Sequence, residues 1–187
     1  MKKNVAVVGA TGIAGQQFLV ALHDHPWFNI ASLAASERSA GKRYGEAIQD
    51  PATGSRRWWC DEELPDGMEQ MIVNDAAALD LAGIDLVFTA IESGPAGKLE
   101  PLYAMTTPVV STASAFRQDP TVPLLIPSVN MEHANLIHSQ RQKCKRSGFI
   151  VTQPNCTTIG LAITLKPIFD LFGLQRIVMT SMQGLSG

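Results

Sequence analysis

The fold is decided at residues 4–22, which read NVAVVGATGIAGQQFLVAL. A short apolar run comes first, glycines follow at Gly9, Gly12 and Gly15, and apolar residues then recur at helical spacing. A strand that is apolar on both faces is typical of a parallel sheet covered on both sides. Glycines between such a strand and a helix allow backbone N–H groups to approach a pyrophosphate, whose charge the helix N-terminus favours. We therefore expect a nucleotide-binding loop here, with a purely structural turn as the alternative.

Strands and helices alternate along the rest of the chain. This alternation predicts a Rossmann-like α/β fold, doubly wound, with a mostly parallel sheet. We expect further strands at residues 29–36, 84–94, 107–116, 122–127, 148–153 and 175–184, and helices at residues 16–26, 129–145 and 157–172. Residues 40–75 break this rhythm, and we expect a small antiparallel meander there, at the edge of the sheet.

The composition excludes several classes of protein. The 187 residues are 45% hydrophobic, which is enough for a real core. A net charge of −2 argues against a nucleic-acid partner, and no apolar run approaches the roughly 18 residues of a membrane span. The three cysteines are an odd number without a CxxC pair. We therefore expect neither a disulfide framework nor a metal site, and we assign the chain to the reducing cytoplasm.

The residues after the second expected strand decide between two nicotinamide cofactors. An NAD site usually has an acidic residue at this position, hydrogen-bonded to the ribose 2′-hydroxyl. Here two cations and two hydroxyls are available to bind a 2′-phosphate through charge-assisted hydrogen bonds, so we expect NADP. The residues are Ser36, Arg38, Ser39 and Lys42. A solvated polar turn, with Glu37 serving NAD, is the alternative.

A second glycine turn follows the strand expected at residues 84–94. Ser93 and Gly94 lie in this turn, at the sheet edge that carries the first glycine loop. They are candidates for contact with the cofactor. A helix capped by Ser93, with Pro95 in its first turn, is an equally good interpretation.

One cysteine occupies a position suited to a nucleophile. Cys156 follows Pro154 and Asn155, between an expected strand and an expected helix. There the sulfur faces the N–H groups and the positive end of a helix, which favour the reactive thiolate. Asn155 is available to stabilise an oxyanion. The alternative is an inert buried cysteine, because free cysteines are among the most buried residues.

At these residues the sequence resembles a known family, the archaeal and fungal branch of the aspartate-semialdehyde dehydrogenases. Segments similar to the N-terminal half of that family occur in order over nearly the whole chain: VAVVGATGIAGQ, AASERSAGK, VSTASAFR, VPLLIPSVN, PNCTTIGLAITLKP and MQGLSG. The resemblance implies the reductive dephosphorylation of a small molecule, aspartyl-4-phosphate, by NADPH. The product would be aspartate semialdehyde, a precursor for the biosynthesis of lysine, threonine and methionine.

The resemblance also implies roles for individual residues. Cys156 matches the family's nucleophile, which carries a thioacyl intermediate, and Asn155 matches the asparagine before it. Gln183 matches a glutamine that orients the intermediate, and Arg117 matches an arginine that contacts the phosphate. The flanking segments depart from the family pattern at Thr112, Phe116 and Ser128. For the cofactor, the resemblance implies contacts with Gly9, Thr11, Gly12, Ile13, Ser36, Arg38 and Ser39. The full expected cofactor site adds the candidates Lys42, Ser93 and Gly94 described above, together with Ser186 and Gly187.

The resemblance further implies a second domain. We expect residues 1–155 to form an NAD(P)-binding domain and residues 156–187 to begin a substrate and dimerisation domain, whose arginine and histidine base lie beyond Gly187. We therefore expect the chain to bind NADP weakly, to have little activity alone and to self-associate as a homo-oligomer through its C-terminal strand. A malonyl-CoA reductase and a non-catalytic nucleotide-binding module are the alternatives.

Overall fold

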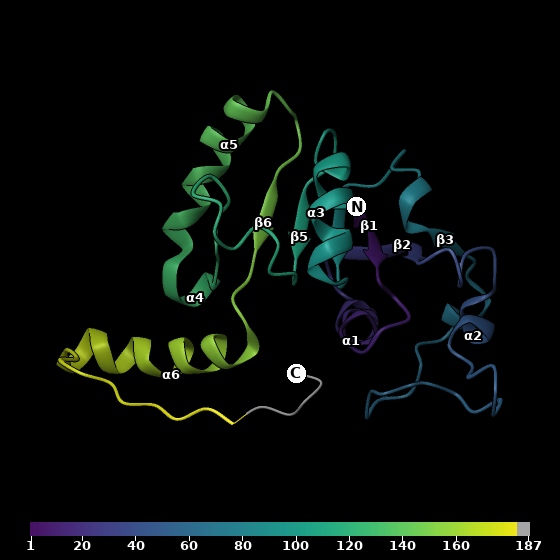
Figure 1. Ribbon diagram of the computed structural model, residues 1–187, viewed down its shortest axis with the longest axis horizontal. Coiled ribbons are helices and arrows are strands. Elements are labelled where there is room, and N and C mark those ends of the chain that lie inside the picture. Colours follow the sequence, from purple (N-terminus) through teal and green to yellow (C-terminus); the bar gives the residue numbers. More distant parts are fainter. Residues whose placement is uncertain (183–187) are drawn as a thin grey trace.

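The computed structural model describes residues 1–182 of the chain. Within them lies one six-stranded sheet with the strand order β3-β2-β1-β4-β5-β6, and every neighbouring pair is parallel (Figure 1). This is the strand order of dinucleotide-binding folds. The strands are β1 (Lys3–Val8), β2 (Phe28–Ala35), β3 (Val73–Asp75), β4 (Leu86–Thr89), β5 (Val109–Ser111) and β6 (Ile150–Thr152).

Helices connect the strands, as the alternating pattern predicts. The α-helices are α1 (Ile13–Leu22), α2 (Tyr44–Ala47), α3 (Ser93–Tyr103), α4 (Pro127–Asn130), α5 (Leu136–Cys144) and α6 (Cys156–Phe172). Short 3-10 helices lie at η1 (Met68–Gln70), η2 (Ala76–Ala78) and η3 (Met131–Asn135). The helix expected at residues 129–145 is therefore present in three consecutive pieces. The doubly wound, Rossmann-like α/β fold is confirmed.

The core lies on both faces of the sheet, which explains why β1 is apolar from Val5 to Val8. Val5 and Val7 pack on one face with Leu19 of α1, whereas Ala6 and Val8 pack on the other face with Tyr103 of α3. These four residues of β1 are fully buried. Each buried valine contributes about 1.5–3 kcal/mol relative to an exposed one. A continuous apolar strand thus fixes the centre of the fold.

The prediction of an antiparallel edge meander at residues 40–75 was wrong. The edge strand is β3, which pairs in parallel with β2, and the segment before it forms only isolated antiparallel bridges between Arg43 and Ile72 and between Gln49 and Arg56. Prolines, which have no N–H group to donate to a ladder, interrupt this segment at Pro51 and Pro65. Turns and side-chain hydrogen bonds therefore organise it.

Two other expected strands are also absent from the described residues. Residues 122–127 make a single parallel bridge, from Leu124 to Thr152, because the prolines Pro123 and Pro127 flank it and cannot donate. Of the strand expected at residues 175–184, the described residues 175–182 form no strand and pair with none of the strands β1 to β6. Val178 in this segment is 89% exposed.

The parallel sheet brings all six carboxyl ends to one edge. The chain leaves β1 toward β2 on one side, while β4 lies on the other, so the order reverses between β1 and β4. Doubly wound sheets bind their ligands outside this edge, at the reversal. Helix α6 projects from the β6 end of the sheet beside α4, and none of its residues is buried (Figure 1).

Within residues 1–182, no helix combines the length and the apolar character needed to cross a membrane.

Candidate functional site

Two of the three glycines in the first loop are required by packing. Gly9 has φ +84°, and a Cβ there would lie 2.2 Å from the carbonyl oxygen of Ala90. A Cβ on Gly15 would lie 2.1 Å from the carbonyl oxygen of Gly9. A Cβ on Gly12 would meet only that oxygen, at 3.5 Å, which is an ordinary contact. Gly12 is the N-cap residue of α1. The fold therefore needs Gly9 and Gly15, while the space in front of Gly12 is open.

A pocket of about 440 Å³ lies beside this loop. It is bounded by the glycine loop, the turn after β2, helix α2 and an arm of irregular chain at residues 49–57. Five of the residues expected to bind the cofactor line it: Thr11, Ser36, Arg38, Ser39 and Lys42. The structure thus brings together residues that lie far apart in the sequence, from Thr11 to Lys42. Ile13 lies at the first position of α1 and is exposed.

The cations that line the pocket differ in whether a carboxylate is paired with them. Arg57 is paired with Asp50, whose oxygen accepts hydrogen bonds from the guanidinium, with Nε at 3.0 Å. These hydrogen bonds, together with the backbone N–H groups of Ala52 and Thr53, lower the pKa of Asp50 to about 2. Arg38 and Lys42, by contrast, make no ion pair within residues 1–182. An incoming anion therefore meets two cations that are not already neutralised by a carboxylate.

Sequence reasoning missed the residues on the far side of this pocket. Glu46, Asp50 and Arg57 line it as well. They come from α2 and from the arm at residues 49–57, which has no periodic pattern. No signal in the sequence places this arm over the glycine loop, because the contacts that do so are made by side chains far apart in the chain.

Two buried side chains hold the pocket in place. Nε2 of Gln16 donates to the carbonyl oxygen of Arg57 at 2.7 Å, and its Oε1 accepts from the N–H of Trp59 at 2.8 Å. The hydroxyl of Tyr44 donates to the carbonyl oxygen of Ala10 at 2.7 Å. Burial raises the pKa of Tyr44 well above its usual range. Gln16 therefore ties the arm to α1, and Tyr44 ties α2 to the glycine loop.

The turn after β4 lies at the same edge. Ser93 is the first residue of α3, whose N-cap is Glu92, so Ser93 is not the capping residue. Its hydroxyl is hydrogen-bonded to the hydroxyl of Ser114 in the loop that follows β5. A Cβ on Gly94 would meet no atom within 4 Å. This turn is thus open toward the edge and joined to the neighbouring loop.

Arg117 is bound to backbone rather than pointing freely into solvent. Its Nε donates to the carbonyl oxygen of Gln153 at 2.9 Å, and its Nη2 donates to the carbonyl oxygen of Thr112 at 2.8 Å. The side chain thus links the loop after β5 to the segment that leads from β6 to Cys156. Any contact of Arg117 with a phosphate would use its remaining N–H groups.

Cys156 is exposed and begins α6. Asn155 is the N-cap, and its Oδ1 accepts from the backbone N–H of Thr158 at 2.8 Å and from the hydroxyl of Thr157 at 3.2 Å. Cys156 is therefore not a buried cysteine, and its role as a nucleophile stays a prediction. The side-chain oxygen of Asn155 thus caps the helix. This cap fixes the first turn of α6, in which Cys156 is the first residue. The expected site residues Gln183, Ser186 and Gly187 lie outside the described residues.

The other two cysteines, also free thiols, lie elsewhere. Cys144 is exposed at the end of α5. Cys60 is half-buried and accepts a hydrogen bond from Nε2 of Gln17 at 3.2 Å. Burial raises the pKa of the Cys60 thiol, and the carboxylates of Glu62 and Asp61 raise it further. Cys60 is therefore poorly suited to react as a thiolate.

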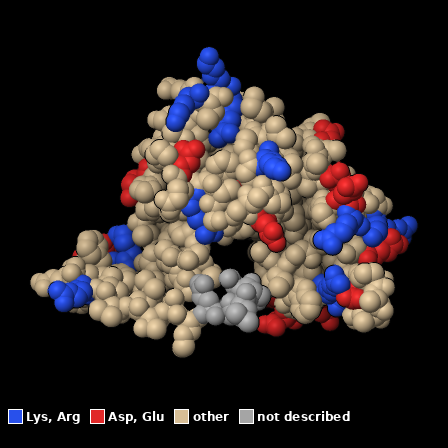
Figure 2. Space-filling model, viewed as in Figure 1, with Lys and Arg blue, Asp and Glu red and all other residues tan. Residues whose placement is uncertain are grey.

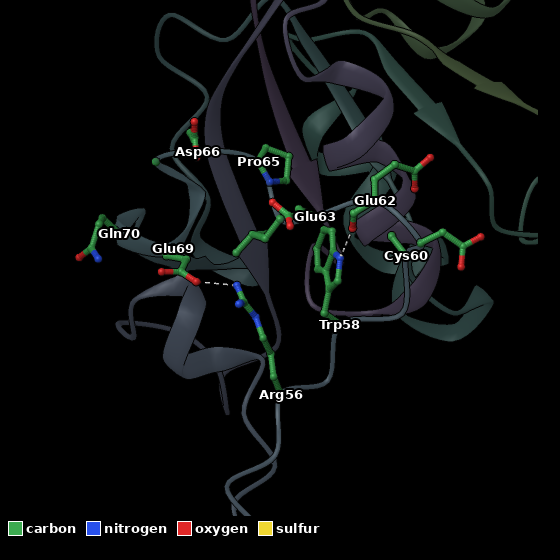
Figure 3. A pocket seen from close by; sticks show the side chains of 12 residues that line it. Arg56, Trp58, Cys60, Glu62, Glu63, Pro65, Asp66, Glu69 and Gln70 are labelled. Atoms are coloured by element: carbon green, nitrogen blue, oxygen red, sulfur yellow. Dashed lines mark hydrogen bonds and ion pairs between the residues drawn. The ribbon is translucent and has the colours of Figure 1, made fainter.

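A second hollow, of about 640 Å³, has the wrong charge for an anionic cofactor. Figure 3 shows Arg56 directed at Glu69, with which it forms an ion pair, and the indole of Trp58 donating to the backbone of Glu62. The remaining charged groups that line it are carboxylates: Asp61, Glu62, Glu63 and Asp66. In Figure 2, charges of both signs gather on the side of the molecule where Figure 1 places α2 and β3, whereas the surface around α6 carries few charges.

The strand order, the glycine loop and the open sheet edge define a dinucleotide-binding α/β domain. Residues 4–137 match the family model described as the NAD binding domain of semialdehyde dehydrogenase. The chain therefore belongs to the semialdehyde dehydrogenase family.

Relatives of this chain include aspartate-semialdehyde dehydrogenases from archaea and fungi. This chain is 44% identical over 184 residues to aspartate-semialdehyde dehydrogenase of Methanothermobacter thermautotrophicus. The alignment covers 98% of this chain and 51% of the relative. It is 46% identical over 190 residues to the protein of that name from Archaeoglobus fulgidus, with 100% and 52% covered. The crystal structure of aspartate semialdehyde dehydrogenase with NADP from Candida albicans matches with a TM-score of 0.79 and 35% identity, over 93% of this chain and 48% of that one.

These relatives confirm the resemblance read from the sequence, including its archaeal and fungal character. The chain spans about half the length of the curated relatives it matches.

Proposed function

We propose that this chain is the cofactor-binding and cysteine-bearing part of an NADP-dependent aspartate-semialdehyde dehydrogenase. One observation carries the proposal: the glycine loop, a pocket with two unpaired cations and an exposed cysteine at a helix start all lie at the carboxyl edge of one parallel sheet. β1 and β6 are three strand spacings apart in this sheet, or about 14 Å. A dinucleotide is long enough to cover that distance.

The residues present fit NADP better than NAD. Arg38 and Lys42, with the hydroxyls of Ser36 and Ser39, line one pocket and offer charge-assisted hydrogen bonds to a 2′-phosphate. Glu37, the residue that would favour NAD, does not line that pocket. The open space at Gly12 gives a pyrophosphate access to the N-terminus of α1. NADP is also the cofactor in the solved Candida albicans relative. When bound, this cofactor supplies the hydride.

Cys156 is the proposed nucleophile. Its thiolate attacks the carbonyl carbon of aspartyl-4-phosphate, the new C–S bond forms, and phosphate leaves with the electron pair of the broken C–O bond. A hydride then adds to the carbonyl carbon of the thioacyl group, and the C–S bond breaks to release aspartate semialdehyde and the thiolate. The first turn of α6, fixed by the Asn155 cap, stabilises the negative sulfur at both ends of this cycle.

The remaining site residues have supporting roles in this proposal. Arg117 holds the segment before Cys156 and has N–H groups left for the leaving phosphate. Gln183 orients the intermediate, and Ser186 and Gly187 contact the cofactor. The substrate follows from the shared name of the relatives, which favours aspartyl phosphate over a malonyl-CoA thioester. A homo-oligomer stays a prediction.

Calorimetry at one salt concentration tests the cofactor assignment. We expect NADP to bind more tightly than NAD, and Arg38→Ala to lose about tenfold in NADP affinity with NAD affinity unchanged, since a hydrogen bond to a charged group is removed. Lys42→Ala should act in the same direction. Lys2→Ala, which removes an exposed cation at the amino edge of the sheet, is the matched control. Tighter binding of NAD, or an Arg38→Ala variant with unchanged NADP affinity, would overturn the assignment. No binding of either nucleotide would overturn the whole proposal.

A further inference from the structure

A carboxyl group is buried beneath the site and has no part in the proposed chemistry. Glu100 of α3 is fully buried. Its Oε1 accepts hydrogen bonds from the hydroxyls of Thr89 and Ser111, both at 2.6 Å. Its Oε2 is buried without a hydrogen bond within residues 1–182. Burial raises the pKa of Glu100. Burying a carboxyl group is costly, so the burial of Glu100 beneath the edge of the sheet needs a reason.

The two hydroxyls that Glu100 binds mark the ends of neighbouring strands. Thr89 is the last residue of β4 and Ser111 is the last residue of β5, and the two are paired across the sheet. Glu100 therefore links α3 to the carboxyl ends of both strands. These are the ends from which the Ser93 turn and the loop with Arg117 depart.

Ser111 continues the connection to the cysteine. Its Oγ accepts from the N–H of Ala113 at 3.1 Å, and its carbonyl oxygen accepts from the N–H of Gln153 at 3.1 Å. The carbonyl oxygen of Gln153 in turn accepts from Nε of Arg117 at 2.9 Å. Gln153 directly precedes Pro154 and the Asn155 cap of α6. Ser111 is thus bonded on one side to Glu100 and on the other to the segment that carries Cys156.

We propose that Glu100 is a positioning residue that, through Ser111 and Gln153, holds the segment leading to Cys156 at the carboxyl edge of the sheet. The inference rests on the proposed function, in which Cys156 is the nucleophile. Glu100 touches neither the cysteine nor the cofactor pocket. It acts by fixing the Ser111 side chain, whose backbone then sets the place of Gln153.

Four variants separate this role from a general contribution to the core. Glu100→Leu removes the acceptor, and Ser111→Ala removes the hydroxyl while leaving the carboxyl group. Glu100→Gln keeps an oxygen that can accept both hydrogen bonds and is the conservative rescue. Thr89→Val removes the other hydroxyl, which has no hydrogen bond to Gln153. Gln140→Leu is a further control, because Gln140 is a buried polar residue that binds Ile150 at the opposite end of β6.

Amide hydrogen exchange at Gln153, measured by NMR on the full chain, is the first readout. We expect exchange to be about fivefold faster in Glu100→Leu and Ser111→Ala, as for the loss of one hydrogen bond. Glu100→Gln, Thr89→Val and Gln140→Leu should stay within about twofold of the wild type. The second readout is the ratio of iodoacetamide labelling at Cys156 to that at Cys144 in the same sample. This ratio should change by about threefold or more in Glu100→Leu and Ser111→Ala, and in none of the other variants.

Lower global stability in Glu100→Leu and Ser111→Ala, with both readouts at wild-type values, would overturn the inference and leave Glu100 as a core residue. Equal changes in Gln140→Leu would also overturn it, because the effect would then be general destabilisation. NADP affinity is measured separately on the same proteins. Absent or NAD-selective binding counts against the proposed function, whereas the exchange and labelling ratios decide the role of Glu100 in either case.

Discussion

Replacing Gly15 by alanine should destabilise the protein through a single backbone clash. The added Cβ would lie 2.1 Å from the carbonyl oxygen of Gly9 and 2.8 Å from the Cα of Ala10, so backbone atoms must move by about 1 Å to reach ordinary contact. Overpacking of this kind costs about 1–3 kcal/mol, and the upper end applies because no side chain can rotate away. Alanine in the helix α1 returns about 1 kcal/mol. The expected net loss in the free energy of unfolding is about 2 kcal/mol.

Gly12→Ala is the matched variant, which should keep its stability but lose affinity for NADP. Its Cβ would meet only one atom, at 3.5 Å. Losing glycine at the N-cap costs about 0.5 kcal/mol, so the stability should change little. The methyl group would instead occupy the space through which a pyrophosphate approaches the start of α1. We therefore expect NADP affinity to fall by about tenfold or more.

Urea denaturation followed by circular dichroism measures the first effect, and calorimetry with NADP measures the second. With a denaturant slope near 2 kcal/mol/M, the unfolding midpoint of Gly15→Ala should fall by about 1 M. A Gly15→Ala midpoint equal to that of the wild type would refute the packing argument. A Gly12→Ala variant that loses as much stability as Gly15→Ala would refute the assignment of different roles to the two glycines.

Two further predictions concern charge and capping. Because the hydrogen bonds from Arg57 lower the pKa of Asp50 from 3.8 to about 2, ionised Asp50 stabilises the fold above about pH 4, and this contribution disappears as the pH falls toward 2. The thermal midpoint of Asp50→Asn should thus lie below that of the wild type at pH 6 and converge with it near pH 2; a gap independent of pH would contradict the ion pair. Asn155→Ala removes the cap on the N–H of Thr158, worth about 1 kcal/mol, and since α6 has no buried residue the loss should appear as about fivefold faster exchange of the Thr158 amide with an unchanged global midpoint. A lower global midpoint would mean that α6 unfolds together with the core.

The parts of the fold that could be predicted from sequence are those fixed by local pattern. The short, β-branched apolar run of β1, ended by glycine, is typical of a strand buried on both faces, and the glycines after it favour a tight turn into a helix. Cys156 follows a strand and precedes a helix with a good cap, so its place at the N-terminus of α6 is also a local property. For the same reason, Arg38 and Lys42 could be assigned to one turn.

The parts that could not be predicted depend on contacts across the chain. Residues 40–75 contain apolar pairs that look like strands, but Gln16 and Tyr44 draw this segment onto the glycine loop instead. Residues 175–182 have strand-forming side chains, but no strand within the described residues pairs with them. The link from Glu100 to Ser111 joins a helix to a strand end, and neither residue has a neighbour in sequence that signals it.

The claim that the cofactor pocket and Cys156 belong to one site is tested most directly by the reactivity of the cysteines. Iodoacetamide labelling of Cys156, Cys144 and Cys60 can be followed by mass spectrometry in one sample, with and without saturating NADP. We predict that NADP changes the labelling rate of Cys156 by about threefold or more and leaves Cys144 and Cys60 unchanged, because only Cys156 lies at the edge where the nicotinamide end would reach. Calorimetrically demonstrated NADP binding with no change at Cys156 would contradict a shared site.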